Sequence, residues 1–283
     1  MKKSAFILMQ YILPQHLLSA LMHKIARCKA NWFKNFLTTQ FIKLFNVNMS
    51  EAAEPDPEQY EHFNAFFTRH LKNDARPLDD IENNLASPVD GTVSQLGQIT
   101  NSQVFQAKGK HFNLAALLGS DTMTADFEDG SFNTIYLSPK DYHRIHFPTD
   151  GKLKKMVHIP GDLFSVNQTT VEAVDELFAR NERVVAFFDT PAGPMAMVMV
   201  GAIFVSSIET VWHGEVTPPR HNQIRRWTYE DSALSFNKHD EMAFFNMGST
   251  VILLYGKDAV SWDDELTAGQ TVRRGQPIGH INK

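Results

Sequence analysis

Hydrophobic positions follow a helical period in the first 50 residues and a strand-like texture in the later part of the chain. The apolar stripe of one early segment is formed by Phe33, Leu37, Phe41 and Leu44. Beyond Ser87, short apolar runs are separated by turn residues. Turn-then-strand units recur at residues 90–93, 150–153 and 213–216. The pattern predicts an α+β fold in which N-terminal amphipathic helices precede a mainly β body.

The clearest strand signal is residues 242–255 (MAFFNMGSTVILLY), where two apolar runs flank a small Gly-Ser-Thr triplet. This segment predicts a strand, a tight break and a second strand. Helical windows in the body cover residues 58–72, 114–118 and 171–180. Residues 268–279 have the turn texture of barrel-sandwich modules, so we expect barrel-sandwich-like elements in the body.

Composition changes sharply near residue 51. Residues 1–50 contain seven Lys or Arg and no Asp or Glu, which leaves 20 basic against 32 acidic residues in the rest of the chain. The sequence Glu-Pro-Asp-Pro at residues 54–57 is a breaker at this junction. We therefore expect a membrane-associating helical segment at residues 1–50 and a separate body at residues 51–283.

The basic, acid-free head predicts an anionic surface as its partner, and its apolar content favours lipid over nucleic acid. Its first apolar stretch, residues 5–13, ends at Pro14 and is shorter than the roughly 20 residues that span a bilayer. No small-residue cleavage site of a signal peptide follows. We expect interfacial helices on a membrane surface. The alternative is that these helices only cover the core of the body.

The amount of apolar sequence fits a folded globular protein. Of the 283 residues, 43% are hydrophobic, which suffices for one large domain or two small ones. Cys28 is the only cysteine, so the chain has neither an intrachain disulfide nor a cysteine zinc site.

Gly248 and Ser249 place an unshielded carbonyl next to a hydroxyl, so Ser249 could attack the bond that joins the two residues. Gly-Ser is also common in ordinary hairpin turns. Other segments supply what such an attack needs, namely a carboxylate at Asp90 and imidazoles at His143 and His146. These residues form the candidate catalytic set.

The two histidines follow a predicted strand at residues 134–137 and a Ser-Pro-Lys-Asp turn. Residues three apart on a regular strand point to opposite faces. His143 and His146 therefore serve one cavity only if a bulge intervenes, and otherwise serve different faces or different steps. Two structural histidines are the plainest alternative. We expect no metal, because the nearby carboxylates lack metalloprotease spacing and no cysteine assists.

Over nearly its whole length the chain resembles the bacterial phosphatidylserine decarboxylases. The matching segments are residues 11–14 (YILP), 63–69 (FNAFFTR), 88–91 (PVDG), 138–146 (SPKDYHRIH), 160–167 (PGDLFSVN), 177–183 (LFARNER), 207–210 (SIET) and 248–250 (GST). The last is the self-cleavage motif of that family. The chain departs from the family pattern at Asp240 and Ala243, where glycines are expected, and at Met247, where Leu or Phe is commoner.

The resemblance implies a self-cleaving proenzyme that converts phosphatidylserine to phosphatidylethanolamine and CO2. Ser249 attacks the Gly248 carbonyl, and the product is a large chain, residues 1–248, and a small chain, residues 249–283, that begins with a pyruvoyl group. This group forms a Schiff base with the substrate amine and accepts electrons as CO2 leaves, so neither pyridoxal phosphate nor a metal is expected. Asp90 and His146 complete a charge relay with Ser249. His143 positions the substrate or donates a proton.

The expected partners are phosphatidylserine in the membrane, the membrane surface, and the two chains of one precursor. Nucleic acid is not expected, and a homo-oligomer stays open. The expected location is peripheral, on the cytoplasmic side of the cell membrane. Two other functions compete. A membrane-anchored barrel-sandwich carrier without catalysis needs a hairpin-tip lysine, for which Lys155 is poorly placed, and a serine hydrolase needs a Gly-x-Ser-x-Gly elbow that Ser249 lacks.

Overall fold

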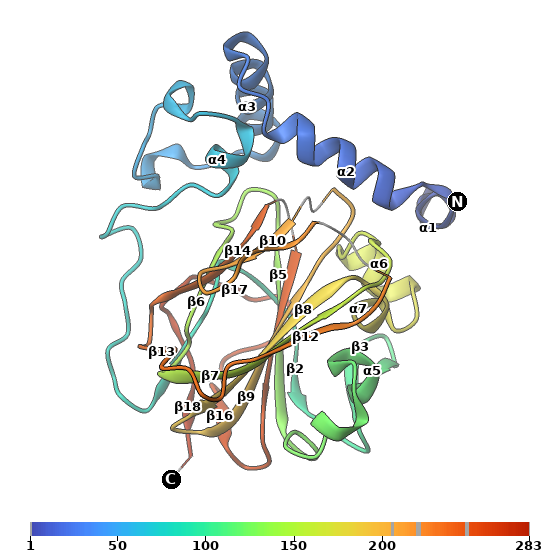
Figure 1. The fold of residues 1–283 in the computed structure, drawn as a ribbon, viewed down its shortest axis with the longest axis vertical. Helices are drawn as coiled ribbons and strands as arrows, with labels where there is room; N and C mark the ends of the chain where they lie inside the picture. Colours follow the sequence, from blue (N-terminus) through green and yellow to red (C-terminus); the bar gives the residue numbers. More distant parts are fainter. Residues whose placement is uncertain (1, 205–206, 219–221, 247–248, 283) are drawn as a thin grey trace.

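The computed structural model describes residues 2–204, 207–218, 222–246 and 249–282. Three helices lie along one end of a β body, and the C-terminal strands lie toward the other end (Figure 1). The helices are α1 (Lys2–Ile12), α2 (Gln15–Ala26), α3 (Asn31–Phe45), α4 (Phe63–Phe67), α5 (Leu114–Leu118), α6 (Gln168–Ala173) and α7 (Leu177–Arg180). Helices followed mainly by strands confirm the predicted α+β fold.

The body is built from one large sheet and several smaller ones. The large sheet has the order β12-β7-β8-β9-β15-β5-β2-β17, and β13 also pairs with β7. Its strands are β2 (Gly91–Gln98), β5 (Ser131–Leu137), β7 (Gly151–Ile159), β8 (Arg183–Thr190), β9 (Gly193–Val200), β12 (Arg225–Thr228), β13 (Ser235–Phe236), β15 (Ser249–Tyr255) and β17 (Thr271–Val272).

A second sheet lies beside the first and has the order β11-β10-β14-β6. Its strands are β6 (Arg144–His146), β10 (Ser207–Thr210), β11 (Gly214–Thr217) and β14 (Glu241–Asn246). The remaining strands form the order β1-β18-β16 and the pair β3-β4, namely β1 (Asn84–Ala86), β3 (Gln103–Ala107), β4 (Lys110–Asn113), β16 (Val260–Trp262) and β18 (Pro277–Ile281).

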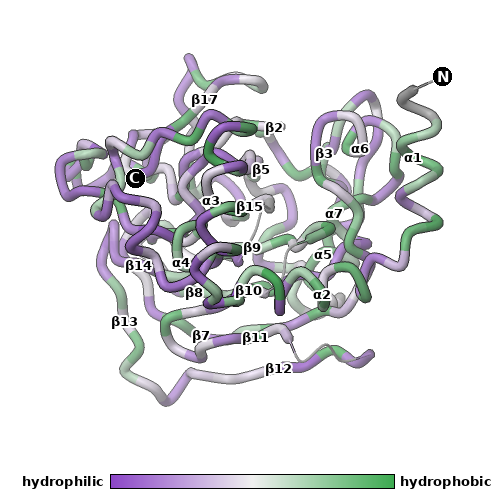
Figure 2. The backbone as a smooth tube through the Cα atoms, turned by 90° about the horizontal axis from the view of Figure 1, so that it is seen from above, coloured by the Kyte–Doolittle hydropathy of each residue, from purple (hydrophilic) through white to green (hydrophobic). Residues whose placement is uncertain are grey.

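β15 occupies the middle of the large sheet. It pairs with β5 on one side and β9 on the other, and Figure 2 shows it near the centre of the molecule. The run Val251 to Tyr255 is fully buried, which agrees with its continuous apolar sequence, because a strand covered on both faces has no polar alternation. The two predicted strands are confirmed as β14 and β15, which belong to different sheets. Of the predicted break, Gly248 lies outside the described residues, whereas Ser249 and Thr250 already belong to β15.

The predicted turn-then-strand units are also confirmed, because β2, β7 and β11 begin at Gly91, Gly151 and Gly214. Gly91 has a steric reason to be glycine. A Cβ atom there would lie 2.5 Å from the carbonyl oxygen of Tyr136, so no larger residue fits against the neighbouring strand. This close packing fixes the position of Asp90, the residue directly before the strand.

Two predicted helices are wrong in extent. Residues 58–72 contain only α4 and, before it, a short 3₁₀ turn at Pro57–Gln59. The side chain of His62 accepts from the N–H of Ala65, so α4 begins there with its own cap. The window at residues 171–180 is divided between α6 and α7, because Glu176 takes a left-handed conformation with φ 51°. The helix predicted at residues 114–118 is confirmed as α5.

One side of the N-terminal helices is packed on the body. Ser165 N donates to Gln10 Oε1 at 3.0 Å, and Leu163 N donates to Gln15 Oε1 at 2.6 Å. Phe41 on α3 packs edge-on against α4, with ring centroids 5.1 Å apart at Phe63. The alternative that these helices cover a core is therefore correct for this side.

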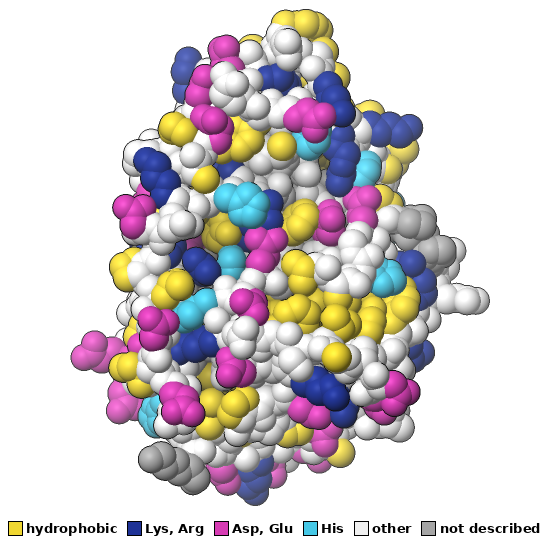
Figure 3. All heavy atoms as spheres, turned by 60° about the vertical axis from the view of Figure 1, so that its left-hand side comes forward, with side chains coloured by type: hydrophobic (Ala, Val, Ile, Leu, Met, Phe, Trp, Pro, Cys, Tyr) yellow, Lys and Arg dark blue, Asp and Glu magenta, His cyan; other side chains and the backbone are white. Residues whose placement is uncertain are grey.

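The opposite side of the same helices exposes large apolar side chains. They include Leu8, Tyr11, Ile12, Leu17, Leu21, Trp32, Phe36 and Leu44. Within the described residues no single helix is long and apolar enough to cross a membrane, although residues 5–12 and 15–26 reach that length and composition together as a pair bent by 82°. On the face seen in Figure 3, acidic and basic side chains are interspersed, so that face has no large basic patch of the kind that binds nucleic acid.

Candidate active site

The candidate site is centred on the end of β14 and the start of β15, which together we call the corner. Gly248 lies outside the described residues, as does the side chain of Ser249, while the backbone of Ser249 opens β15 opposite Leu137. The next residue, Thr250, pairs with Val200 on β9 and Tyr136 on β5. The predicted cleavage bond therefore precedes the central strand of the large sheet.

His143 lies beside the end of β14 that leads into this corner. Its carbonyl accepts from the N–H of Phe245 at 3.1 Å. Its ring is fully buried and packs against Phe67, with centroids 4.1 Å apart. Nδ1 donates to the carbonyl of Asp141 at 2.8 Å, which leaves Nε2 without its proton and without a partner. Burial lowers the pKa of His143 to about 3, so the ring is neutral near pH 7.

His146 lies at the other end of the same strand pairing, opposite Glu241 at the start of β14. Both of its ring nitrogens are engaged. Nδ1 donates to the carbonyl of His239 at 2.9 Å, and Nε2 accepts from the hydroxyl of Tyr142 at 3.0 Å. Burial, together with the nearby charge of Arg274, lowers the pKa of His146 to about 3. The two histidines thus have different surroundings, one of the alternatives that their spacing leaves open.

Asp90 is held by cations rather than by an imidazole. Nε of Arg76 donates to its two carboxylate oxygens at 3.0 and 3.1 Å, and Nη2 donates at 2.5 Å. The backbone N–H of Arg274 adds a bond of 2.9 Å. In the described part of the chain Asp90 and His146 share no side-chain hydrogen bond. Their segments meet through the backbone, where His146 N donates to the carbonyl of Pro88 at 2.9 Å.

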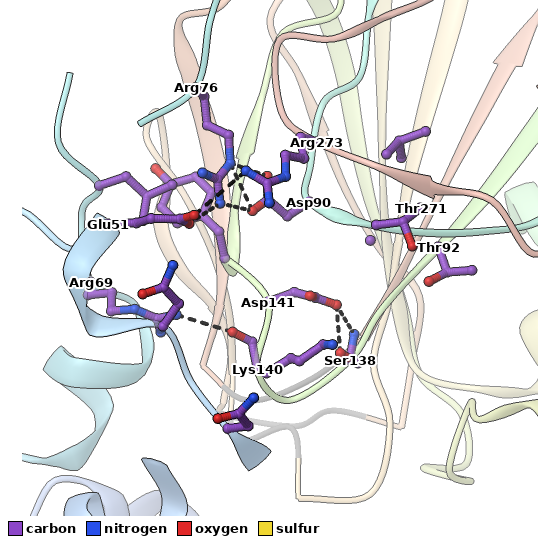
Figure 4. Close-up of a pocket in the computed structure, with 16 residues that line it drawn as sticks. Glu51, Arg69, Arg76, Asp90, Thr92, Ser138, Lys140, Asp141, Thr271 and Arg273 are labelled. Carbon is purple, nitrogen blue, oxygen red and sulfur yellow. Dashed lines mark hydrogen bonds and ion pairs between the residues drawn. The ribbon is translucent and has the colours of Figure 1, made fainter. Parts of the chain in front are cut away.

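A polar pocket of about 260 Å³ lies beside Asp90 (Figure 4). Arg76 bridges Asp90 and Glu51, the latter at 2.7 Å, and Glu51 lies directly after the N-terminal helices. Arg69 is buried as well. One of its nitrogens donates to the carbonyl of Lys140, and its Nε has no partner. Burial lowers the pKa of Arg69, which is the expected effect for a cation removed from water.

The sequence alone did not single out Arg69, Arg76 or Tyr142. Arg69 and Tyr142 fall within the segments 63–69 and 138–146 that carry the family resemblance, so those motifs were the available signal. For Arg76, the only available signal in the sequence was its positive charge within an acidic stretch. Its partners lie 14 and 25 residues away, and no local pattern indicates such pairs.

Other polar atoms near the corner also lack partners. Asn64 donates to Asn246 Oδ1 at 2.7 Å, and Asn246 in turn donates to the hydroxyl of Ser207. Asn64 Oδ1 and Thr250 Oγ1 are buried without a hydrogen bond, as is Nε2 of His143. Unpaired buried polar atoms are uncommon in folded proteins. These three atoms are therefore available to a polar group that enters the site. Among the described residues, no group of three or more His, Cys, Asp or Glu could hold a metal ion.

The chain is similar to known proteins over almost its whole length. A family model described as "Phosphatidylserine decarboxylase" matches residues 63–280, and a second, described as "PSD", matches residues 5–46. A phosphatidylserine decarboxylase proenzyme of Pseudomonas fluorescens is 55% identical over 283 residues, covering 99% of this chain and 98% of the relative. One from Azotobacter vinelandii is 53% identical over 286 residues, covering 100% of both chains.

These matches cover both the N-terminal helices and the β body. The chain belongs to the phosphatidylserine decarboxylase family.

Proposed function

We propose that this chain is a proenzyme that cleaves itself between Gly248 and Ser249 and then converts phosphatidylserine to phosphatidylethanolamine and CO2. The observation that carries the proposal is the family match over almost the whole chain, which includes the Gly248-Ser249 pair of the sequence, with Ser249 as the first residue of β15. The relatives are named as proenzymes of this decarboxylase. Neither a carrier nor an ordinary serine hydrolase accounts for that combination.

Self-cleavage is a transfer of the chain from nitrogen to oxygen. The Ser249 hydroxyl attacks the Gly248 carbonyl, the peptide bond opens, and an ester joins the two residues. Loss of the Cα proton from residue 249 then releases the large chain as a carboxylate, and addition of water with loss of ammonia leaves a pyruvoyl group. His146, oriented by Asp90, is proposed to take the hydroxyl proton. For this, the Tyr142 hydroxyl must leave Nε2, Nδ1 must leave the carbonyl of His239, and Asp90 must turn from Arg76 toward the ring.

The decarboxylation site fits the group that cleavage would create. When present, the pyruvoyl ketone supplies the electron sink that amino acid side chains lack. Nε2 of His143 is buried and has no hydrogen-bond partner, and the His143 carbonyl bonds to the end of β14, which supports a role in accepting a hydrogen bond from the incoming ammonium of the serine head group. The same nitrogen is proposed to carry the proton that goes to the carbon that has lost CO2, because the negative phosphate and carboxylate of the bound lipid favour the protonated ring. Burial keeps the ring neutral between turnovers, so Nε2 is free for each new substrate.

The N-terminal helices are proposed to hold the protein on the cytoplasmic surface of the cell membrane. Exposed apolar residues occur as i,i+4 pairs, such as Leu17 with Leu21 and Trp32 with Phe36, which form continuous stripes. Part of the positive charge is used internally, because Arg27 pairs with Glu215 at 3.0 Å and Lys29 with Glu61 at 2.5 Å. Apolar contact is therefore the larger part of the proposed attraction.

The mass of the purified protein tests cleavage directly. We expect a large chain ending at Gly248 and a small chain beginning at residue 249, the latter lighter than the encoded peptide because its amine has been lost. Ser249→Ala should give one full-length inactive species, because alanine has no oxygen to attack or eliminate. Ser235→Ala, at an exposed serine of β13, is the matched control and should process normally. A full-length wild-type chain that makes phosphatidylethanolamine would overturn the proposal.

A further inference from the structure

A second pocket opens between α1 and the ends of strands in the large sheet. Its volume is about 380 Å³. Phe6 and Met9 of α1, with Leu13 just after it, form one wall. The end of β5 and the residues that follow β5 and β9 form the other, together with residues 165–167. None of the described residues that line it is Asp, Glu, Lys, Arg or His. We call it the α1 pocket. It contrasts with the charged pocket of Figure 4, where several Arg and Asp side chains meet.

The inner end of the α1 pocket lies next to the cleavage residue. Leu137 lines the pocket and is the strand partner of Ser249. On the other flank, Ala202 lines the pocket just beyond β9, whose Val200 pairs with Thr250. Neighbouring strands lie roughly 4.8 Å apart. The inner wall is therefore about one strand spacing from the residue at which the proposed chemistry occurs.

The outer end of the α1 pocket meets apolar surface. Met9 is 46% exposed and Phe204 is 43% exposed, and both line the pocket. Leu8 and Ile12, on the same helix, are exposed beside Met9. The pocket thus opens onto the surface that we propose to lie at the bilayer, and it extends inward as far as Leu137, the strand partner of Ser249.

The walls are held in place rather than resting loosely together. Gln10 fixes α1 to the body through the N–H of Ser165, a residue that also lines the pocket. Phe204 has φ 68°, a conformation that a bulky side chain rarely adopts, and its N–H donates to the hydroxyl of Ser19 at 3.3 Å. Strained residues of this kind persist where the surrounding structure holds them and often mark binding sites.

We propose that the α1 pocket binds a fatty acyl chain of phosphatidylserine while the head group reacts at residue 249. This inference rests on the proposed function. The pocket is lined mainly by apolar side chains, with Gln10, Tyr136, Ser165 and Asn167 as its polar members, and none of its described lining residues is charged. It therefore suits hydrocarbon better than the phosphate, carboxylate or ammonium of the head group. The pocket extends from the neighbourhood of the reacting residue to the exposed side of α1. A lipid whose head group reacts while its tail stays near the bilayer must span the same two places. Each methylene that the pocket buries is worth roughly a factor of four in affinity.

Filling the pocket tests this assignment with the full-length, processed enzyme. Ala202→Phe fills it from the sheet side, and Leu13→Trp fills it from α1, so one variant remains informative if the other folds poorly. Each enzyme is assayed in the same detergent micelles with dipalmitoyl and with dihexanoyl phosphatidylserine. We expect kcat/KM for the long-chain lipid to fall by about 10-fold or more, mainly through KM, while the short-chain value changes less than about threefold. Chain cleavage should be unchanged.

Several outcomes would overturn the acyl assignment. An equal loss on both lipids would place the effect on folding or on the head group, and no loss on either would show that the pocket is not used. A change in oligomeric state by light scattering would make a second copy of the chain the occupant. Ile81→Trp, at an exposed apolar residue outside the pocket, should leave the chain-length preference unchanged. If the wild type decarboxylates neither lipid, the proposed function itself fails, and this inference with it.

Discussion

At the scale of single residues, His143 and His146 differ in what their Nε2 atoms meet. Nε2 of His143 has no hydrogen-bond partner and lies beside the end of β14. Nε2 of His146 accepts a hydrogen bond from the Tyr142 hydroxyl. We predict that His143→Ala still cleaves but decarboxylates about 10²-fold more slowly or worse, since acid–base assistance is typically worth about 10² to 10⁴ in rate. His146→Ala should instead stay uncleaved. Gel analysis of the chains, paired with phosphatidylethanolamine formation, measures both.

Two further variants complete this comparison. Asp90→Asn should slow cleavage less than His146→Ala, because it leaves the base in place, and His111→Ala, at an exposed histidine of β4, should behave as wild type. If His143→Ala fails to cleave while His146→Ala cleaves, the two roles are exchanged. The bare nitrogen beside the corner would then be the base for Ser249. Normal cleavage in all of these variants would mean that strain at the Gly248–Ser249 bond drives the reaction.

The same two histidines predict how stability depends on pH. Burial lowers both pKa values to about 3, whereas an unfolded histidine titrates near 6.5. Between those pH values the two histidines are protonated in the unfolded chain but not in the folded chain. The free energy of unfolding therefore falls as pH falls from about 6.5 toward 3. The expected slope is roughly 1.4 kcal/mol per pH unit for each histidine. Urea unfolding of the uncleaved Ser249→Ala chain, with and without His143→Gln, measures it, and equal slopes would contradict it.

The sequence was sufficient to select Asp90, His143, His146 and Ser249 as candidates but not to pair them. The actual partners of Asp90 are Arg76 and Arg274, and those of His146 are Tyr142 and a carbonyl far along the chain. Such contacts depend on how β6 and β14 align and on where the C-terminal segment returns. Neither appears in a local pattern. The relay inferred from the resemblance therefore stays a prediction that requires rearrangement, because among the described side chains Asp90 and His146 are bonded to other partners.

At the scale of elements, α2 gives the clearest test of membrane binding. Deleting residues 1–46 would also uncover the phenylalanine cluster around Phe63, so it mixes membrane binding with folding. The double variant Leu17→Ser and Leu21→Ser changes only the exposed stripe. We predict that it weakens liposome binding by about 10-fold or more and leaves chain cleavage unchanged, because burying each leucine in lipid contributes about 1.5–3 kcal/mol. Liposome flotation measures binding.

A matched control for this double variant is Leu78→Ser, an exposed leucine of the body, which should bind liposomes as wild type. If the double variant binds liposomes as well as the wild type, α2 does not contribute to membrane binding and only covers the body. Added salt should weaken wild-type binding only partly, because Arg27 and Lys29 are already paired within the protein.

Helical periodicity correctly predicted that helices exist in these segments but overestimated their length. The phenylalanines at positions 63, 66 and 67 resembled the apolar face of a helix spanning residues 58–72, yet they belong to a helix of five residues that packs on Phe41. Packing of a few aromatic rings stabilises this segment, so no long helix is required. The prediction of a strand on each side of Gly248 was more accurate, because both strands are present as β14 and β15. A short continuous run of β-branched and aliphatic residues usually forms a buried strand.

At the scale of the whole molecule, the predicted small chain contributes strands to different parts of the body. β15 lies between β5 and β9, β17 pairs with β2, and β18 pairs with β1 and β16. Arg274, also in this chain, donates its N–H to Asp90. Cleavage between Gly248 and Ser249 would therefore cut the backbone at a corner without removing any of these pairings. The two chains should stay together as one folded unit.

This arrangement predicts that unfolding of the cleaved protein depends on its concentration. Once the backbone is cut, unfolding releases two separate chains, so dilution favours the unfolded state and the Tm should rise with protein concentration. In Ser249→Ala the same strands remain on one chain, so its Tm serves as the control for any effect of self-association. Both forms should elute as one species of equal size from a gel-filtration column. A small chain that separates without denaturant would contradict the central position of β15, and equal concentration dependence in both forms would contradict chain release.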